Sequence, residues 1–181
     1  MKYMFASDVH GSAFYCRKML EAYREEGAER LVLLGDLLYH GPRNDLPKEY
    51  APKEVIAMLN EMKNEIYAVR GNCEAEVDQM VLNFPVMADY CILVIDGLTF
   101  YATHGHVYNE NNLPPFREGD ILIHGHTHVL KAEQREGYIL LNPGSVSIPK
   151  EGNPPTYAVL EDKVFTIKDF DGNIIKEMRL A

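Results

Sequence analysis

The sequence predicts a single mixed α/β domain over residues 1–181, and three observations support this fold class. The length of 181 residues suits one domain with a substantial core. In the first half, strand-like and helix-like patterns alternate as β-α-β-α-β, which implies parallel strands with right-handed crossovers. After about residue 83 no long helical pattern appears, and short strands follow one another without a linker or an internal repeat.

The first half contains signals for strands at 2–7, 31–34 and 66–69 and for two helices. The first helix, expected at 14–26, places Met19, Leu20 and Tyr23 on one face, and Gly27 is its expected C-terminal stop. A loop rich in turn residues at 39–52 precedes the second helix. That helix is expected to begin at Pro52, because proline fits a first helical turn.

The second half predicts strands at 91–95, 98–103, 121–123, 138–141, 157–160, 164–167 and 174–178. Asp96-Gly97 is typical of a two-residue hairpin turn, and Asp171-Gly172 marks another hairpin.

Composition excludes several classes of protein. With 46% apolar and 25% charged residues the chain is globular, and no apolar run approaches the ~20 residues of a membrane helix. No signal peptide is apparent at the start of the chain. A formal charge of -9 argues against a stable complex with nucleic acid. Three cysteines without a CxxC pair favour a reducing, cytoplasmic compartment, and Cys16 and Cys91 are expected to be buried packing residues.

Five apolar runs each end in side chains of the kind that bind metal ions. These side chains are Asp8 and His10, then Asp36, Asn72 and His104, and finally His124, His126 and His128. Because the ends of parallel strands converge on one crevice, side chains there come close together. Residues two apart in an extended segment point the same way, so Asp8 with His10, and His126 with His128, can each hold one ion. His124 is expected to pack in the strand or to support a ligand.

The remaining seven candidates offer imidazole, carboxylate and amide groups but no thiolate, which suits Mn, Fe, Co, Ni or Zn. Seven ligands are more than one ion needs. Two ions about 3.5–4 Å apart could share Asp36 and activate a bridging water for in-line attack on a phosphoryl group. Two such ions also outweigh the charge of Asp8 and Asp36, so the centre would attract an anionic phosphate despite the acidic chain.

Five blocks of this sequence resemble the signature of the calcineurin-like metallophosphoesterases. They are Asp8-x-His10, Gly35-Asp36, Gly71-Asn72, Thr103-His104-Gly105 and Gly125-His126-Thr127-His128. Three further blocks resemble the small bacterial YfcE-type phosphodiesterases, namely Gly41-Pro42-Arg43-Asn44, Arg70-Gly71-Asn72-Cys73-Glu74 and Asn142-Pro143-Gly144-Ser145. The resemblance covers nearly the whole chain.

The resemblance implies a sandwich of two mixed β-sheets flanked by helices, in four layers αββα. It also implies two divalent ions per chain, usually Mn in this subgroup, and hydrolysis of a small phosphodiester substrate by a hydroxide that bridges them. By the same resemblance, one ion takes Asp8, His10, Asp36 and His128, and the other takes Asp36, Asn72, His104 and His126.

Cys73 departs from the family pattern, because many members have histidine there to protonate the leaving group. A thiol is a poor substitute, so Cys73 is either a small packed side chain or a weak catalytic group. His40 or His106 could replace it, and Arg43 and Asn44 could hold a phosphoryl oxygen. The candidate catalytic residues are therefore Asp36, Asn72, Cys73 and His104, and the candidate substrate-binding residues are His40, Arg43, Asn44 and His106.

Two alternatives to a phosphodiesterase remain. The same centre could serve a phosphomonoesterase or a nucleotide pyrophosphatase, depending on the pocket formed by loops 39–52 and 106–118. A catalytically weak scaffold protein of the same fold is the other alternative, but such scaffolds have replaced ligands and here every ligand position is occupied. Edge strands of the C-terminal hairpins could support a homodimer.

Overall fold

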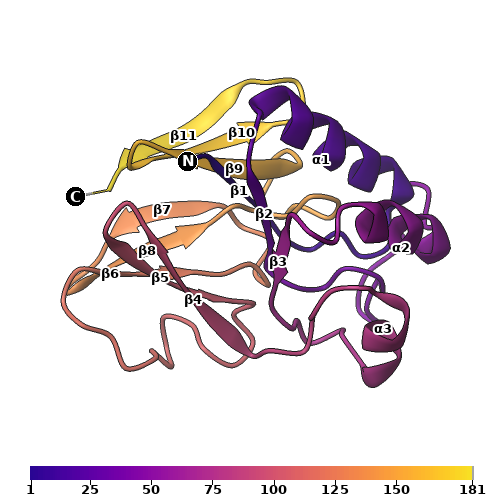
Figure 1. Cartoon of the computed structure of the whole chain (residues 1–181), viewed down its shortest axis with the longest axis horizontal. Helices are drawn as coiled ribbons and strands as arrows, with labels where there is room; N and C mark the ends of the chain where they lie inside the picture. Colours follow the sequence, from indigo (N-terminus) through magenta and orange to yellow (C-terminus); the bar gives the residue numbers. More distant parts are fainter. Residues whose placement is uncertain (181) are drawn as a thin grey trace.

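The computed structural model describes residues 1–180, which form two β-sheets packed face to face (Figure 1). Sheet 1 has the strand order β11-β10-β9-β1-β2-β3, and sheet 2 has the order β4-β5-β6-β8-β7. The strands are β1 (Tyr3–Ala6), β2 (Arg30–Leu33), β3 (Ile66–Ala68), β4 (Tyr90–Ile95), β5 (Leu98–Thr103), β6 (Asp120–Ile123), β7 (Lys131–Gln134), β8 (Tyr138–Asn142), β9 (Thr156–Glu161), β10 (Val164–Asp169) and β11 (Ile174–Arg179). The helices are α1 (Ala13–Glu26), α2 (Pro52–Glu61) and α3 (Glu76–Val81).

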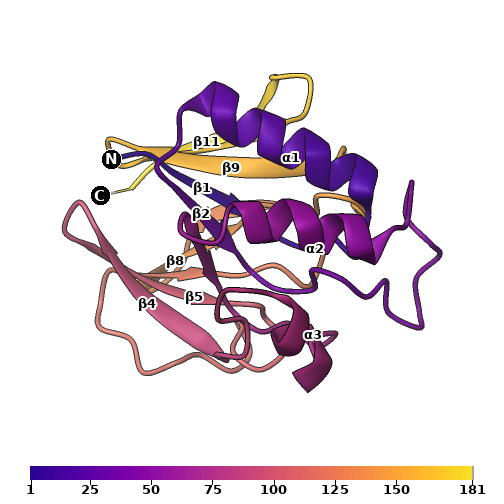
Figure 2. The same ribbon diagram turned by 45° about the vertical axis from the view of Figure 1, so that its right-hand side comes forward.

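The predicted β-α-β-α-β unit forms half of sheet 1. β1 pairs with β2, and β2 with β3, in parallel, while β9 pairs antiparallel with β1. Helices α1 and α2 lie side by side on the outer face of this sheet (Figure 2). α1 begins after Ser12, whose hydroxyl accepts the Tyr15 N–H, and ends at Gly27 in the left-handed conformation, as predicted.

Two hydrophobic cores lie on the two sides of sheet 1. Met4 points toward the helices and packs with residues such as Leu59, whereas Phe5 points toward sheet 2 and stacks on Phe100. This alternation follows from the two-residue period of a strand. Sheet 1 is therefore buried on both faces, which holds the ends of β1 and β2 in place.

Sheet 2 contains the predicted β4–β5 hairpin, in which Asp96 and Gly97 both have the positive φ that a tight hairpin turn requires. The outer layer over this sheet is the 104–119 loop rather than a helix, since Phe116 contacts Tyr101 and Tyr138 from that side. Pro114 and Pro115 each lack an N–H, which disfavours helix formation in this loop.

Two elements and one burial state differ from the sequence prediction. Helix α3 and strand β7 were not predicted, and β7 pairs along the edge of sheet 2 with β8. Cys16 is buried as expected, but Cys91 is only partly buried because it lies on the edge strand β4.

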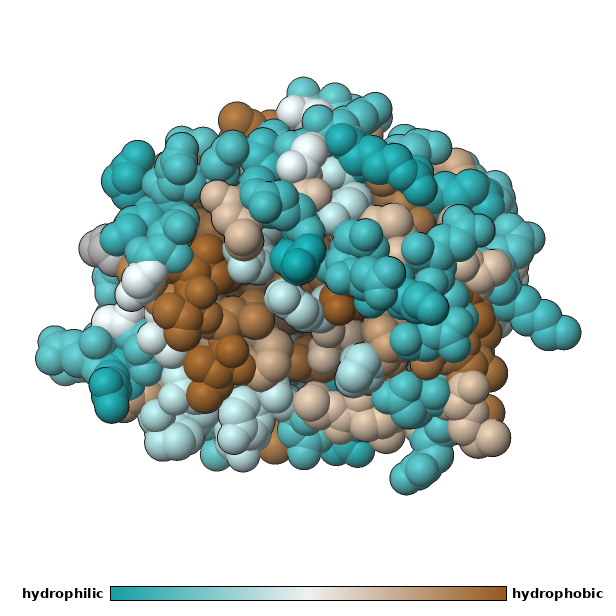
Figure 3. All heavy atoms as spheres, in the orientation of Figure 1, coloured by the Kyte–Doolittle hydropathy of each residue, from teal (hydrophilic) through white to brown (hydrophobic). Residues whose placement is uncertain are grey.

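Apolar side chains are exposed over β4, where Figure 3 shows a hydrophobic patch on the face seen in Figure 1. Ile92 and Val94 contribute to the exposed apolar surface of this strand. Within residues 1–180, no helix combines the length and the apolar character needed to span a membrane.

Candidate metal centre

The predicted ligands follow directly after strands of both sheets. Asp8 and His10 follow β1, Asp36 follows β2, and His126 and His128 follow β6. All five have positive φ, between 50° and 63°. This conformation is uncommon for residues other than glycine, and its cost is typically accepted at functional sites. The backbone therefore turns sharply at each strand end and directs these side chains into one space.

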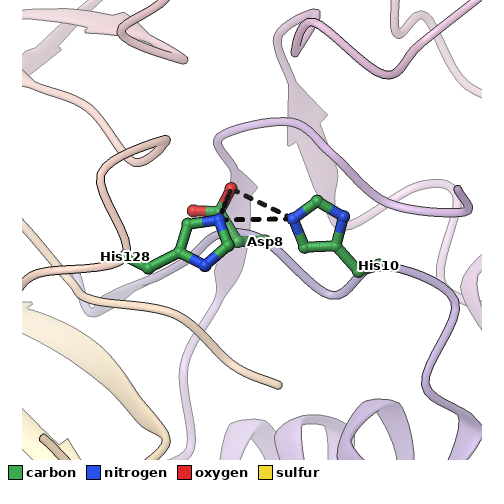
Figure 4. Close-up of side chains that lie close together, drawn as sticks. All are labelled: Asp8, His10 and His128. Carbon is green, nitrogen blue, oxygen red and sulfur yellow. Dashed lines mark hydrogen bonds and ion pairs between the residues drawn. The ribbon is translucent and has the colours of Figure 1, made fainter. Parts of the chain in front are cut away.

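The first group consists of Asp8, His10 and His128, whose side chains point toward one another (Figure 4). Asp8 Oδ1 lies 3.3 Å from His128 Nε2 and 3.7 Å from His10 Nε2, and the two ring nitrogens are 3.3 Å apart. All three side chains are at most 4% exposed. Within residues 1–180, Asp8 Oδ1 is buried and has no hydrogen-bond partner.

Hydrogen bonds on the far side of each ring fix its orientation. The Nδ1–H groups of His10 and His128 donate to the carbonyl oxygens of Tyr39 (2.7 Å) and Ile148 (2.6 Å). Because a carbonyl oxygen only accepts, Nδ1 must carry the proton, and the lone pair of each neutral ring is on Nε2. Two lone pairs and a free carboxylate oxygen thus converge, which is the donor set of a cation site.

The second group consists of Asp36, His104 and His126, with Asn72 at its edge. His104 Nε2 lies 3.3 Å from Asp36 Oδ2, 3.2 Å from His126 Nδ1 and 3.1 Å from Asn72 Oδ1. His104 Nδ1 donates to the Leu34 carbonyl at 2.6 Å, which again leaves Nε2 facing the group.

Asp36 lies between the two groups. Its Oδ2 is 3.7 Å from His10 Nε2 of the first group and 3.3 Å from His104 Nε2 of the second. Its other oxygen, Oδ1, accepts the Cys73 N–H at 2.9 Å. One carboxylate oxygen is therefore close to ligands of both groups, as a bridging residue requires.

The electrostatics of the centre favour bound positive charge. Burial opposes ionisation of Asp8, but the His10 and His128 rings outweigh it and hold the pKa of Asp8 well below its usual range. Burial also opposes the charge on His104, yet Asp36 raises the pKa of His104 to about 9. His126, buried beside His104, has its pKa lowered to about 4.

Glu74 supports the centre from behind and was assigned no role in the sequence analysis. Its buried carboxylate accepts the N–H groups of Asp36 (2.8 Å), Leu37 (2.7 Å) and Gly71 (2.5 Å). It therefore ties the loop after β2 to the loop after β3. The sequence signal that could have pointed to Glu74 is its position as an acidic residue directly after the Gly-Asn-Cys block.

His124 is buried directly after β6, and its contacts are to a loop residue and to a backbone carbonyl. Its fully buried ring contacts Glu110 Oε2 at 3.1 Å and the Gly125 carbonyl at 2.9 Å. Glu110 also pairs with Lys131 at 2.6 Å. This cluster anchors the 104–119 loop beside the strand end that holds His126.

A cavity of about 410 Å³ opens onto the centre. Its lining includes five of the seven predicted ligands, the other two, Asp8 and His104, being fully buried. Arg43, Asn44 and Cys73 line it as expected, and so does Lys150, which the sequence analysis did not single out.

The other candidate substrate-binding residues lie elsewhere. His40 does not line the cavity, and its ring packs edge-on against Tyr39 and Tyr50. His106 does not line the cavity either; its ring lies 5.4 Å from that of His104, and burial lowers the pKa of His106. The 106–118 loop contributes no lining residue, so of the two loops expected to shape the pocket only 39–52 does so.

This fold and site define a class of protein. The chain belongs to the calcineurin-like phosphoesterase superfamily, whose domain model matches residues 1–163. The assignment confirms the predicted enzyme class, a hydrolase acting on ester bonds, and implies that the domain binds divalent metal. The convergent buried donors, including the unpartnered Asp8 Oδ1, fit such an ion.

Among individual relatives, the chain is 48% identical to Phosphodiesterase YfcE of Escherichia coli (strain K12), over 92% of this chain and 91% of the relative. The solved structure of the E. coli phosphoesterase YfcE superimposes with a TM-score of 0.98, at 46% identity and with both chains fully covered. This match confirms the predicted fold. Vacuolar Protein Sorting 29 from Cryptosporidium parvum, at 18% identity and a TM-score of 0.63 over 98% of this chain and 97% of that one, shares the fold alone.

Proposed function

We propose that this chain is a metal-dependent phosphodiesterase that hydrolyses small phosphodiester substrates. One observation carries the proposal. Acceptor atoms of two buried groups converge on either side of Asp36 Oδ2 and face a cavity. The activity named for the 48% identical relative, a phosphodiesterase, supports the choice of substrate bond.

Two divalent ions are part of the proposal, with Mn first and Zn, Fe, Ni or Co as alternatives. Asp8, His10, Asp36 and His128 would hold one ion, and Asp36, Asn72, His104 and His126 the other. When bound, the ions would lower the pKa of a coordinated water and neutralise charge on phosphoryl oxygens.

The residues of the chain have separable tasks in this reaction. The carbonyl groups of Tyr39, Leu34 and Ile148 keep three histidine rings oriented toward the centre. The Cys73 N–H and the Glu74 carboxylate fix Asp36. Arg43 and Asn44 line the cavity where a phosphoryl oxygen would bind.

The test measures bound metal and compares two substrates. We expect about two ions per chain and faster hydrolysis of bis-p-nitrophenyl phosphate than of p-nitrophenyl phosphate with Mn²⁺ present. Asp36→Asn should abolish both activities. A preference for the monoester would instead support the phosphomonoesterase alternative, and activity that survives chelation or Asp36→Asn would contradict the metal mechanism.

A further inference from the structure

Two cationic side chains, Arg43 and Lys150, line the cavity. Some cations of the described chain, such as Lys168 and Arg70, are paired with carboxylates at 2.6 Å. For Arg43 and Lys150, no ion pair within 4.0 Å occurs in residues 1–180. Their charges are therefore available to a ligand in the cavity.

The two cations come from separate segments that are both fixed near the centre. Arg43 belongs to the loop after β2, in which Asn44 Nδ2 donates to the His40 carbonyl at 2.8 Å. Lys150 follows β8, and its backbone N–H donates to the carbonyl of the predicted ligand His128 at 3.1 Å. Lys150 is therefore held beside the metal centre by its backbone while its side chain remains exposed.

The rest of the lining excludes other kinds of recognition. Apart from the histidine rings of the centre, none of the lining residues is aromatic, and Pro42 carries the one purely hydrocarbon side chain among them. A nucleobase is usually bound by stacking on an aromatic side chain, and an apolar alcohol by an apolar wall. This cavity offers neither, so charge is the main property by which it can select the alcohol part of a substrate.

We propose that Lys150, together with Arg43, recognises a second anionic group on the substrate, so that the enzyme prefers small phosphodiesters whose alcohol carries an added carboxylate or phosphate. This inference rests on the proposed phosphodiesterase function. The scissile phosphodiester carries a single negative charge, which the two proposed ions would already outweigh. Lys150 supplies further positive charge that only an additional anion would match.

The test uses three p-nitrophenyl phosphodiesters that share one leaving group and differ in the charge of the second alcohol. The alcohols are 3-hydroxypropanoate (anionic), propan-1-ol (neutral) and choline (cationic). In each reaction water adds to phosphorus, the bond to the p-nitrophenyl oxygen breaks, and p-nitrophenolate leaves. We expect kcat/KM to fall from the anionic to the neutral to the cationic ester at low ionic strength, and the differences to shrink as salt is added.

Lys150→Gln should lower the ratio of kcat/KM for the anionic over the neutral ester by about fivefold, the effect of one exposed ion pair. The matched control is Lys63→Gln, which removes the same charge from an exposed position after α2 and should leave the ratio unchanged.

Binding without turnover gives a second readout. 3-Phosphonopropanoate and propylphosphonate differ by one carboxylate, and calorimetry measures their affinities for the Mn²⁺-loaded protein. Lys150→Gln should weaken binding of the first by about fivefold relative to the second. The inference would be overturned if the wild type showed no higher kcat/KM or affinity for the ligand with the added anionic group than for its neutral counterpart. It would also be overturned if Lys150→Gln changed these values by the same factor for both ligands. If no diester is hydrolysed, the proposed function fails, and the binding ratio still decides the role of Lys150.

Discussion

Glu74 connects two of the loops that carry the candidate metal ligands. Its two carboxylate oxygens accept three backbone N–H groups, two of which belong to Asp36 and Leu37. A glutamine has only one oxygen, so Glu74→Gln would place its NH₂ group against a buried N–H. We expect a loss of about 1–3 kcal/mol of unfolding free energy, measured by urea denaturation, together with weaker metal binding.

The exposed residue Glu61 provides the control for that prediction. Glu61→Gln removes the same charge and should change the free energy of unfolding by less than about 0.5 kcal/mol. Equal stability of the two variants would show that Glu74 does not hold the loops.

Cys73 is the residue at which leaving-group protonation can be tested. Burial and the neighbouring Asp36 raise the pKa of its thiol above the usual value, so it is a weak proton donor at neutral pH. Cys73→His should raise kcat for a diester with an alkoxide leaving group by about tenfold or more, and should have a smaller effect for p-nitrophenolate, which needs no proton. Steady-state rates on both substrates give the answer.

Cys73→Ser is the matched control, because it keeps the side chain small and removes the thiol. We expect rates close to those of the wild type if the thiol takes no part in the reaction. A large loss in this variant, with no gain in Cys73→His, would assign Cys73 a catalytic role instead.

At this scale, the sequence was sufficient to single out seven side chains that the structure brings together, and insufficient for the residues that support them. The candidate ligands follow apolar strands, and within each sheet parallel neighbours bring such strand ends together. Glu74, Lys150 and Glu110 gain their positions only from tertiary structure. Glu110, for instance, reaches His124 and Lys131 from a loop without regular structure.

Among the elements, those that the sequence did not predict are the ones that lack a local sequence signal and depend on tertiary structure. Strand β7 has the sequence Lys-Ala-Glu-Gln, which has little strand propensity, and it forms because it pairs with β8 along the edge of sheet 2. Helix α3 is only 6 residues long, too short to show a helical period. The long helices and the hairpins, by contrast, carry local signals in their own residues.

Helix α1 is joined to sheet 1 by an ion pair that makes stability depend on pH. Glu26 at the end of α1 accepts hydrogen bonds from Lys168 of β10 at 2.6 Å and from Tyr157 of β9 at 3.0 Å. Burial raises the pKa of Glu26, but Lys168 and Tyr157 outweigh it and hold this pKa below the usual 4.5. A depressed pKa means that the ionised group stabilises the fold at neutral pH, and that this contribution is lost as the pH falls through the folded-state value.

Glu26→Gln should therefore lower the free energy of unfolding by about 1 kcal/mol at pH 7. The difference from the wild type should begin to shrink below pH 4.5, where the unfolded carboxyl becomes protonated, and should be lost once the pH falls through the lower folded-state pKa. Glu25→Gln, at the neighbouring exposed position, is the control and should have little effect at either pH. Denaturation curves across this range test the prediction, which a pH-independent difference would contradict.

On the scale of the whole molecule, the candidate metal centre lies where the two sheets meet. Asp8 and Asp36 follow strands of sheet 1, and His104, His126 and His128 follow strands of sheet 2. The Asp8 carboxylate also accepts the His126 N–H at 3.1 Å, so the sheets are already linked at this point by a direct hydrogen bond.

The predicted homodimer would form through an exposed edge strand of the C-terminal hairpins, which lies at the edge of sheet 1. Edge strand β11, in the C-terminal hairpin, carries Lys176, Glu177 and Arg179 among its six residues, which is typical of edges that remain unpaired. The homodimer therefore stays a prediction. The charged residues of β11 make this particular edge less suited to pairing with a second copy.

Because the ligands come from both sheets, metal binding should stabilise the entire fold. At a Mn²⁺ concentration about 100 times the Kd, binding adds about 2.7 kcal/mol, which raises Tm by roughly 5–10 °C in a chain of this size. Calorimetry with Mn²⁺ and with a chelator measures this shift. Asp36→Asn should lose most of it, since the shared ligand is weakened, whereas Asp171→Asn at an exposed hairpin turn should keep it. An identical wild-type Tm under both conditions would mean that no ion links the sheets, independently of any assay of hydrolysis.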